Sequence, residues 1–291
     1  MRTPENATRP APTIVFSHAN SFPAGTYRSL IGAWRAAGIT VHALDKFGHD
    51  PRFPVTSNWP NLRDQLIHFI DREVAGPAFL VGHSLGGYLS LMAAARRPDL
   101  AAGLVLLDSP ILSGWKARAL QVAKAAGIGE RLSPGQVSKR RRQHWPSAEA
   151  AFEHFAAKPA FARWAPGVLR DYIACGVERH GAEHRLSFDR DVETTIYNAL
   201  PHQLARTLRT HPLRCAMAFV RGTESTEVRR VGLAATERLA QGRVSTIAGS
   251  HLFPFEHPLE TATEVLRLIA TLPPPRAAPL NPGRGVPTPR L

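Results

Sequence analysis

The sequence has few of the cysteine residues on which disulfide-stabilised and many metal-binding folds depend. Only two cysteines occur among 291 residues, Cys175 and Cys215, and neither has a metal-binding spacing around it. We therefore expect no disulfide framework and no metal site, and a reducing cytoplasm is the default location. No apolar run reaches the ~18 residues that a membrane-spanning helix needs. Residues 1–12 also lack the apolar block of a secretory signal, so neither a membrane span nor export is expected.

Lysine is scarce as well, although the chain is strongly basic. Five of the 36 basic residues are lysines, and the formal net charge is +13 at pH 7. Such a charge raises the question of a nucleic-acid partner. However, the arginines are scattered apart from Arg140, Arg141 and Arg142, and no DNA- or RNA-binding motif accompanies them. The sequence favours a solvated basic surface without a nucleic-acid partner, and the arginine run could also attract an acidic group of a substrate.

Short apolar runs alternate with helical patterns along most of the chain. The runs expected to form strands are residues 13–16, 41–44, 78–81, 104–107, 215–220 and 244–248. The main helical patterns are residues 27–37, 62–74, 85–96 and 256–272. Nearly continuous apolar strands that alternate with helices are typical of a parallel sheet covered on both faces. The predicted fold class is therefore α/β, with a mostly parallel central sheet.

The alternation breaks in the middle of the chain, where helical patterns predominate. We expect residues 111–209 to form a helical cap inserted into an α/β core of residues 12–110 and 210–272. Such a cap would lie over the carboxyl ends of the strands, where open α/β sheets bind their ligands. Residues 1–11 and the proline-rich residues 273–291 are expected to be disordered.

One motif between a predicted strand and a predicted helix carries a chemical signal. Residues 82–87 read Gly-His-Ser-Leu-Gly-Gly, which places Ser84 between Gly82 and Gly86. A nucleophilic serine needs a sharp strand-to-helix turn that exposes its hydroxyl, and small residues on both sides allow the backbone to pack that closely. The following helix would point its N-terminus at the site and favour a developing anion.

From residue 13 to about residue 272 the sequence resembles the α/β-hydrolase family. The resemblance implies that Ser84 is the nucleophile and that the backbone N–H of Leu85 forms one half of an oxyanion hole. In the family the second N–H comes from the loop after the first strand. That loop reads His18-Ala19-Asn20-Ser21-Phe22 here, and Asn20 is the expected donor, with Ser21 as the less favoured alternative. Ala19 stands where many members have glycine.

The resemblance also points to a histidine that accepts the serine proton. In the family this histidine lies in the loop after the last strand. Residues 249–254, Gly-Ser-His-Leu-Phe-Pro, fit that place and identify His251 as the base. The nearest rival is His257, whose position before Pro258 is more typical of a residue that begins a helix.

The acid of the expected triad is not settled by the sequence. Most relatives carry it after the penultimate strand, but the chain after Gly222 contains no Asp. Glu224 or Glu227 could replace it there. Some family members place the acid one strand earlier, where this sequence has Asp108. Because the acid only orients the imidazole and stabilises its cation, its position in the chain is flexible. We predict Asp108, with Glu224 and Glu227 as alternatives.

These residues predict a serine hydrolase that cleaves a carboxylic ester or a related acyl bond of a small molecule, without a cofactor. Serine at the elbow points to an acyl-enzyme, whereas dehalogenases and epoxide hydrolases of the superfamily use Asp. The triad does not separate hydrolysis from acyl transfer or lyase chemistry on the same fold. A third alternative is a non-catalytic binding protein with a degenerate triad, which the missing Asp after Gly222 would favour. The oligomeric state remains open.

Overall fold

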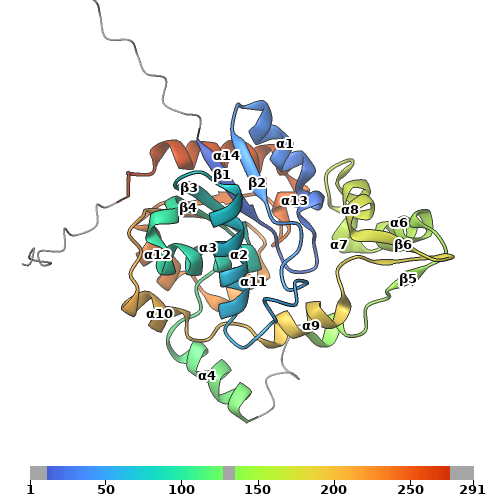
Figure 1. The fold of residues 1–291 in the computed structure, drawn as a ribbon, viewed down its shortest axis with the longest axis horizontal. Coiled ribbons are helices and arrows are strands. Elements are labelled where there is room, and N and C mark those ends of the chain that lie inside the picture. The colour runs from blue at the N-terminus through green and yellow to red at the C-terminus, as the bar shows by residue number, and fades with distance from the viewer. Residues whose placement is uncertain (1–11, 127–134, 276–291) are drawn as a thin grey trace, which may run out of the picture.

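A six-stranded sheet in which all neighbouring strands are parallel forms the centre of the protein (Figure 1). The computed structural model describes residues 12–126 and 135–275. The strand order is β2-β1-β3-β4-β8-β9. The strands are β1 (Thr13–Ser17), β2 (Thr40–Ala43), β3 (Ala78–His83), β4 (Ala101–Leu107), β8 (Met217–Gly222) and β9 (Val244–Ile247).

Helices cover both faces of this sheet and build two hydrophobic cores. On one face lie α1 (Arg28–Ala36) and α14 (Pro258–Thr271), and on the other lie α2 (Pro60–Glu73), α3 (Leu85–Arg96) and α12 (Ala234–Ala240). Within β1, Ile14 and Phe16 belong to the first core and Val15 belongs to the second. Successive side chains of a strand point to opposite faces. Because both faces are buried there, the central strands β3 and β4 are almost entirely apolar, as expected for a covered parallel sheet, whereas the edge strands β2 and β9 also contain polar residues.

The remaining short elements of the core are η1 (Ala24–Tyr27), η2 (Pro98–Leu100), α11 (Thr226–Val231) and α13 (Phe253–Glu256). The sequence predicts a last helix over 256–272, and α14 is that helix with its start at Pro258; the short α13 ends just before it at Glu256. The backbone leaves the helical region at His257, the residue before Pro258, which becomes the first residue of α14. A residue before proline is disfavoured in the helical region, which explains the break.

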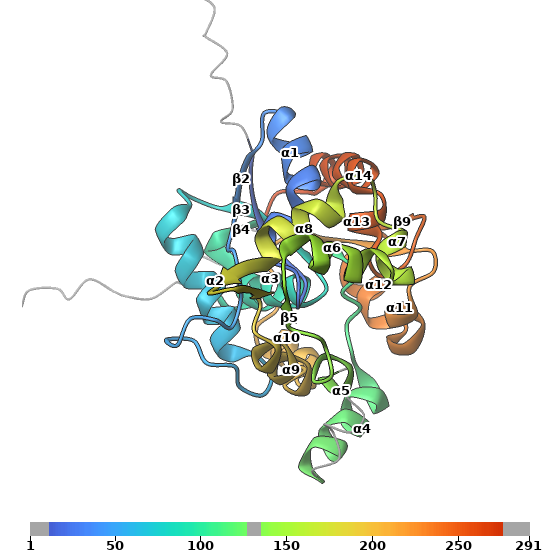
Figure 2. The same ribbon diagram turned by 90° about the vertical axis from the view of Figure 1, so that its right-hand side faces the viewer.

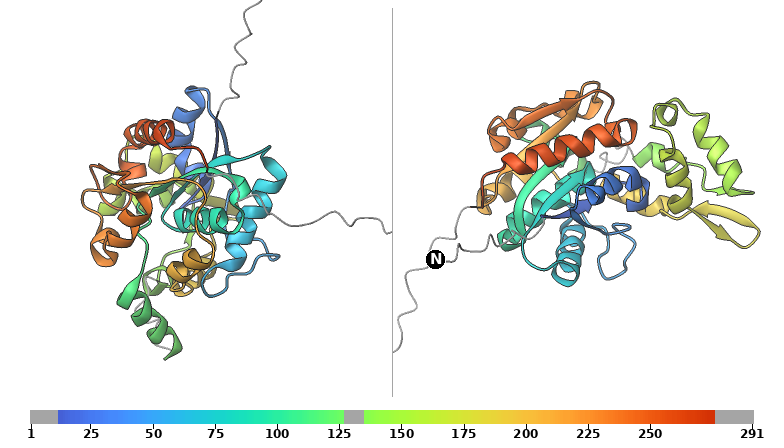
Figure 3. Two further views of the ribbon diagram at one scale, coloured as in Figure 1. Left: turned by 90° about the vertical axis from the view of Figure 1, so that its left-hand side faces the viewer. Right: turned by 90° about the horizontal axis from the view of Figure 1, so that it is seen from above.

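Between β4 and β8 the chain leaves the sheet and forms a separate segment. Its helices are α4 (Gly114–Ala125), α5 (Gly135–Ser138), α6 (Ala148–Ala156), α7 (Pro159–Ala162), α8 (Val168–Gly176), α9 (Arg190–Asn198) and α10 (Leu204–Thr210). It also contains an antiparallel sheet of β5 (His144–Trp145), β7 (Glu183–Leu186) and β6 (Val177–His180), which the sequence patterns do not predict. Figure 1 and the right-hand view of Figure 3 show that α6–α8 and this small sheet stand beside the central sheet. Figure 2 shows that α4 projects away from them.

An aromatic cluster joins this segment to the core. The rings of Trp164 and Phe255 are 4.5 Å apart, and Phe22 lies 5.0 Å from Phe255 and 5.6 Å from Tyr172. A backbone hydrogen bond of 2.9 Å from Ala165 N to the Phe255 oxygen adds to the contact. Tyr172 and Trp164 are buried, so aromatic packing holds the segment against the loops at the carboxyl ends of the strands.

The α/β fold class is confirmed, and the expected strands and main helices are present with boundaries that differ by a few residues. The expectation of disorder in residues 1–11 and 276–291 lies outside the described residues. None of the helices in the described part of the chain combines the length and apolar character needed to cross a membrane.

Candidate active site

The order of the strands brings two loops together at one place. The chain passes from β1 outward to β2 and then returns to add β3 on the other side of β1. At such a switch point the loops after the two central strands separate and leave a crevice. A pocket of about 1250 Å³ lies here, and residues of both loops line it, including Ala19, Asn20 and Ser84. His251 and residues of the segment between β4 and β8 line it as well.

Ser84 lies in the turn between β3 and α3 with a strained backbone. Its φ of 52° and ψ of −115° are unusual for a residue with a side chain. The turn is tight because two glycines flank it: a Cβ at Gly82 would overlap the Gly86 backbone, and a Cβ at Gly86 would overlap the Ser17 carbonyl. The Ser84 side chain is half-buried and lines the pocket. The geometry is that of a nucleophile elbow.

Two backbone N–H groups near Ser84 are available to an anion. The N–H groups of Leu85, the first residue of α3, and of Asn20 have no acceptor among the described residues. The Asn20 side chain is buried and donates from Nδ2 to the Glu193 carbonyl at 3.1 Å, which holds the loop after β1. Partial positive charge at the start of α3 adds to the field at this point.

Of the three acidic candidates, Asp108 makes the close contact with His251. Its Oδ2 lies 2.6 Å from His251 Nδ1, within the range expected for a hydrogen bond. The nearest oxygen of Glu227 is 3.7 Å from the same nitrogen. Glu224 is exposed and accepts two hydrogen bonds, of 2.8 and 3.1 Å, from the guanidinium of Arg163. The geometry therefore favours Asp108 as the partner of His251.

The carboxylate of Asp108 is fully buried, and donors occupy both of its oxygens. The Gly222 N–H donates to Oδ1 at 3.1 Å, and the Ser225 hydroxyl donates to Oδ2 at 2.5 Å. Ser225 in turn accepts a hydrogen bond from Val228 N at the start of α11. A buried carboxylate without such partners would be costly. Most family members would carry an acid in the loop after β8. Here that loop instead supplies the donors that hold Asp108, the residue after β4, in place.

The environment of His251 raises the pKa of its imidazole. Burial disfavours the charged form and by itself lowers this pKa. The hydrogen bond and the negative charge of Asp108 act in the opposite direction and are aided by Glu227, so that the pKa lies above its ordinary value of 6.5. His257, the rival in the sequence, has an exposed side chain 4.0 Å from Glu260 and does not line the pocket.

The loop that carries His251 is anchored by a buried glutamate which the sequence analysis did not identify. Glu256 accepts hydrogen bonds from the backbone N–H of Ser250 at 3.0 Å and from its hydroxyl at 2.5 Å. Arg163, from the segment between β4 and β8, lies 3.3 Å from Glu256. Nothing in the local pattern distinguishes this glutamate from an ordinary residue of the first turn of a helix.

His83, the residue before Ser84, links the loops on both sides of the site. Its Nε2 donates to the His251 carbonyl at 2.9 Å, so Nδ1 must accept, and it does so from the Tyr27 hydroxyl at 2.7 Å. That hydroxyl also accepts from the Ala19 N–H at 3.1 Å. Burial, with the neighbouring His251 as a smaller cause, holds the pKa of His83 well below 6.5. A neutral, fully bonded His83 positions its neighbours rather than exchanging protons.

A buried ion pair completes the pocket and was also missed from the sequence. Arg141 lies 3.0 Å from Glu193 of α9, and the side chains are only 13% and 5% exposed. Glu193 also accepts a hydrogen bond of 2.5 Å from Ser21, and Arg141 donates to the Tyr172 hydroxyl. Because Ser21 and Glu193 are 172 residues apart in the chain, no local signal could reveal the contact.

One group of side chains in the described residues has the spacing to share a metal ion. It consists of Asp108, Glu227 and His251, whose ligand atoms lie within 4.8 Å of one another. Both oxygens of Asp108 already accept hydrogen bonds from protein donors. Hydrogen bonding and charge pairing account for this arrangement without an ion.

Comparison with known proteins agrees with this fold. The sequence model of the alpha/beta hydrolase family matches residues 14–264. The chain belongs to this family. A solved structure of E-2-(acetamidomethylene)succinate hydrolase has the same fold as this alpha/beta hydrolase, with a TM-score of 0.70, 23% identity, and coverage of 90% of this chain and 92% of that one.

Two lipases are similar to part of the sequence. Human monoglyceride lipase is 32% identical over 111 residues, which are 36% of this alpha/beta hydrolase and 37% of the human protein. Lipase LipV of Mycobacterium tuberculosis is 39% identical over 84 residues, or 28% of this chain and 31% of the lipase. The similarity thus spans only about a third of the length of these two relatives.

Proposed function

We propose that this alpha/beta hydrolase is a serine hydrolase that cleaves a carboxylic ester or a related acyl bond. The observation that carries the proposal is the 2.6 Å contact between His251 Nδ1 and the buried carboxylate of Asp108. His251 lines the same pocket as Ser84, whose backbone is strained. A carboxylate at Nδ1 leaves Nε2 of the neutral ring as the proton acceptor, which is the state that a general base requires. The names of the two lipases support an ester as the substrate.

The proposed reaction has two steps. Ser84 Oγ attacks the acyl carbon while His251 Nε2 takes its proton, and the carbonyl oxygen accepts hydrogen bonds from the N–H groups of Leu85 and Asn20. The tetrahedral intermediate expels the alcohol, which receives the proton from His251. Water then attacks the acyl-enzyme, gives its proton to His251 and releases the acid, which restores Ser84. Asp108 stays ionised throughout and stabilises the imidazolium.

We further propose that the segment of residues 111–209 acts as a cap that shapes the substrate pocket. Its residues Phe155, Phe161 and Arg141 line the pocket beside Ser84 and His251 of the core. The cap would therefore select the substrate, while the core loops supply the chemistry. The cytoplasmic location and the small-molecule acyl substrate expected from the sequence stay predictions.

The test of the proposed function is covalent labelling by a fluorophosphonate, followed by hydrolysis of esters of increasing acyl length. Wild-type protein should be labelled at Ser84, and Ser84→Ala should lose both labelling and turnover while retaining its fold. Ser90 is a useful control: it is a buried serine of the following helix, and Ser90→Ala should keep the label. Absence of labelling in the folded wild-type protein would contradict the proposal and favour a binding role.

Product analysis separates hydrolysis from the two alternative reactions. In ¹⁸O-labelled water, a hydrolase incorporates one heavy oxygen into the released acid. An acyltransferase would yield acid only slowly and would turn over faster when an acceptor alcohol or thiol is added. A lyase would release a product without incorporated oxygen.

A further inference from the structure

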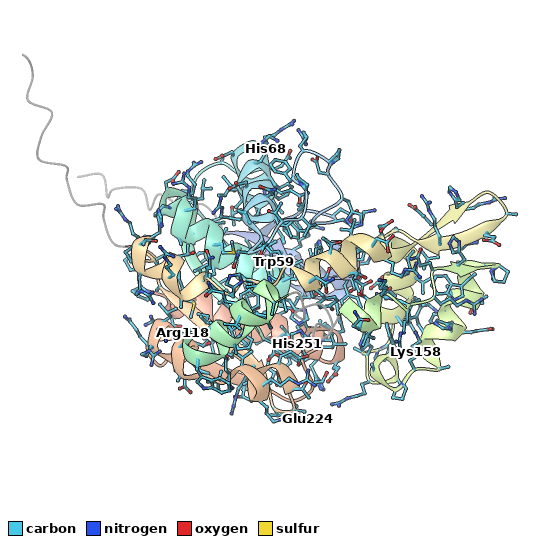
Figure 4. All side chains as sticks on the ribbon, turned by 90° about the horizontal axis from the view of Figure 1, so that it is seen from below. Trp59, His68, Arg118, Lys158, Glu224 and His251 are labelled. Carbon is cyan, nitrogen blue, oxygen red and sulfur yellow. The ribbon has the colours of Figure 1, made fainter. Side chains whose placement is uncertain are left out.

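The cap contributes four cationic side chains to the lining of the pocket. They are Arg140, Arg141, Arg142 and Lys158. The first three lie in the stretch between α5 and β5, and Lys158 precedes α7. Figure 4 shows Lys158 on the outlying segment, whereas His251 and Glu224 belong to the core. Positive charge therefore lies on the cap side of the pocket, away from the core loop that carries His251.

The glutamates that line the pocket do not neutralise all of these cations. Glu193 pairs with Arg141 at 3.0 Å, and Glu224 pairs with Arg163 at 2.8 Å. Glu227 lies 3.7 Å from His251 Nδ1. Each glutamate of the pocket lining thus already faces a cation or the imidazole. Of the four cap cations, Arg141 is the one paired with a lining glutamate.

Lys158 and Arg140 have no carboxylate within 4 Å in the described parts of the chain. The Lys158 ammonium lies 4.9 Å from the ring centre of Phe155, a contact with a π face rather than with an anion. Arg142 donates to the His144 carbonyl and covers the Trp145 ring. These contacts hold Lys158 and Arg142 but give neither of them an anionic partner.

The nearby cations also contribute to lowering the pKa of two titratable groups. Burial, followed by the nearby charge of Arg141, lowers the pKa of Lys158. Burial also lowers the pKa of His154, with further contributions from Lys158, Arg142 and Arg141. An anion bound beside them would reverse these electrostatic effects, because a nearby opposite charge favours the protonated form.

The pocket that the cations share with Ser84 also has apolar lining. Phe22, Phe155, Phe161 and Leu252 line the same pocket, and the rings of Phe155 and Phe161 are 5.0 Å apart. A ligand that contacts both Ser84 and the cap cations would therefore also meet apolar surface in this pocket. Such a ligand has an acyl bond at one end, a short hydrocarbon spacer and an acidic group at the other end.

We infer that the substrate carries an anionic group, a carboxylate or a phosphate, separated from the scissile acyl bond by a short apolar spacer, and that Lys158 with Arg140 binds this group. The inference rests on the proposed function, which it deepens by naming the class of substrate. The acidic group takes no part in bond breaking: it orients the substrate through charge-assisted hydrogen bonds, while Ser84 reacts at the acyl carbon.

The test compares two 4-nitrophenyl esters of the same length, the neutral hexanoate and the monoanionic hydrogen adipate. The ratio of their kcat/KM values is measured for the wild-type protein, Lys158→Met, Lys158→Glu and the control Lys139→Met. Lys139 is an exposed lysine of the stretch between α5 and β5, next to Arg140, and does not line the pocket. Methionine keeps the length of the side chain and removes its charge, and glutamate reverses the charge.

We expect the wild-type protein to prefer the adipate ester, and Lys158→Met to lower the ratio about tenfold, mainly through a higher KM, as for one lost charged hydrogen bond. Lys158→Glu should invert the preference, and Lys139→Met should keep the wild-type ratio. Added salt should weaken the preference. Competitive inhibition by adipate would assign a carboxylate, and stronger inhibition by inorganic phosphate would assign a phosphate.

An unchanged ratio in both Lys158 variants, or a wild-type preference for hexanoate, would overturn the inference. Fluorophosphonate labelling of every variant keeps this failure distinct from failure of the proposed function. If Ser84 is labelled but the kcat/KM ratio is the same in the Lys158 variants, the proposed serine-hydrolase function is retained and the inference of an anionic substrate is rejected. If the folded wild-type protein is not labelled, the proposed function and the inference that rests on it both fail.

Discussion

The hydroxyl of Ser225 donates a hydrogen bond of 2.5 Å to Oδ2 of Asp108, the same oxygen that lies 2.6 Å from His251 Nδ1. Ser225 lies in the loop after β8, where an acid was expected from the family pattern. The two loops meet because β4 and β8 are neighbours in the sheet. A carboxylate after either strand can therefore reach the same imidazole. Here the carboxylate is Asp108 after β4, and Ser225 in the loop after β8 holds it by a hydrogen bond.

The first prediction separates the three acidic candidates. Asp108→Asn should reduce turnover by up to ~10⁴-fold, because the amide favours the wrong tautomer of His251. Glu227→Gln should have a much smaller effect, and Glu224→Gln should alter turnover least, because Glu224 contacts Arg163 instead of His251. Steady-state kinetics on one ester measure all three variants. Normal turnover of Asp108→Asn together with an inactive glutamate variant would identify the acid as that glutamate.

The second prediction follows from the meeting of the two loops. Adding Ser225→Asp to the inactive Asp108→Asn protein should restore part of the lost turnover, because the new carboxylate would arise beside the His251 ring. Adding Ser225→Asn, which has the same shape without charge, is the matched control and should restore nothing. Equal turnover of the two double variants would show that a carboxylate at position 225 cannot serve His251.

The third prediction concerns pH. Because the pKa of His251 is raised above 6.5 and catalysis needs the neutral ring, kcat/KM should increase with pH through a value higher than 6.5. Asp108→Asn removes the larger of the two charges that raise this pKa and leaves burial and the smaller effect of Glu227, so the residual activity should titrate at lower pH. Stability has the opposite sign: the favourable contact of protonated His251 is complete below 6.5 and is lost as pH rises through the folded pKa.

Both parts of the third prediction are measurable. Rate profiles of the wild-type protein and Asp108→Asn give the two apparent pKa values, and urea unfolding at several pH values gives the stability. The prediction is wrong if the rising limb of the wild-type profile lies below 6.5. It also fails if the substitution moves the limb upward.

The fourth prediction tests the link through His83. Tyr27→Phe removes the hydroxyl that donates to His83 and accepts from Ala19, and both partners are buried. Leaving buried groups without partners should cost about 1–3 kcal/mol in the free energy of unfolding. Turnover should also fall, because Ala19 precedes Asn20 of the expected oxyanion hole. Tyr88→Phe is the comparison, since that hydroxyl contacts the Pro110 carbonyl and not His83. Equal kinetic effects of the two substitutions would exclude a specific role for the link.

Much of the core could be predicted from the sequence because its signals are local. The strands around Val15 and Val81 are apolar without interruption, since both faces of the sheet are covered. Ser84 is recognisable because the turn permits only glycine at positions 82 and 86, where a Cβ would overlap backbone atoms. His251 follows from its place between the last strand and the last helices.

Other features depend on contacts between distant parts of the chain. Asp108, Glu224 and Glu227 all carry a carboxylate, so the residue type does not separate them. The sheet, in which β4 and β8 are neighbours, brings Asp108 to His251. The small antiparallel sheet escaped prediction because its strands are two to four residues long and mostly exposed. The pairing of Arg141 with Glu193 likewise needs the folded cap.

The sequence by itself thus determined the α/β fold and the turn around Ser84, because hydrophobic periodicity and steric limits on the backbone act over a few residues. The tertiary structure decided which acid faces His251 and which cations of the arginine-rich stretch are left without an acidic partner. Those outcomes depend on distances of a few ångströms between residues far apart in the chain, and hydrogen bonds and charge pairs are governed by such distances.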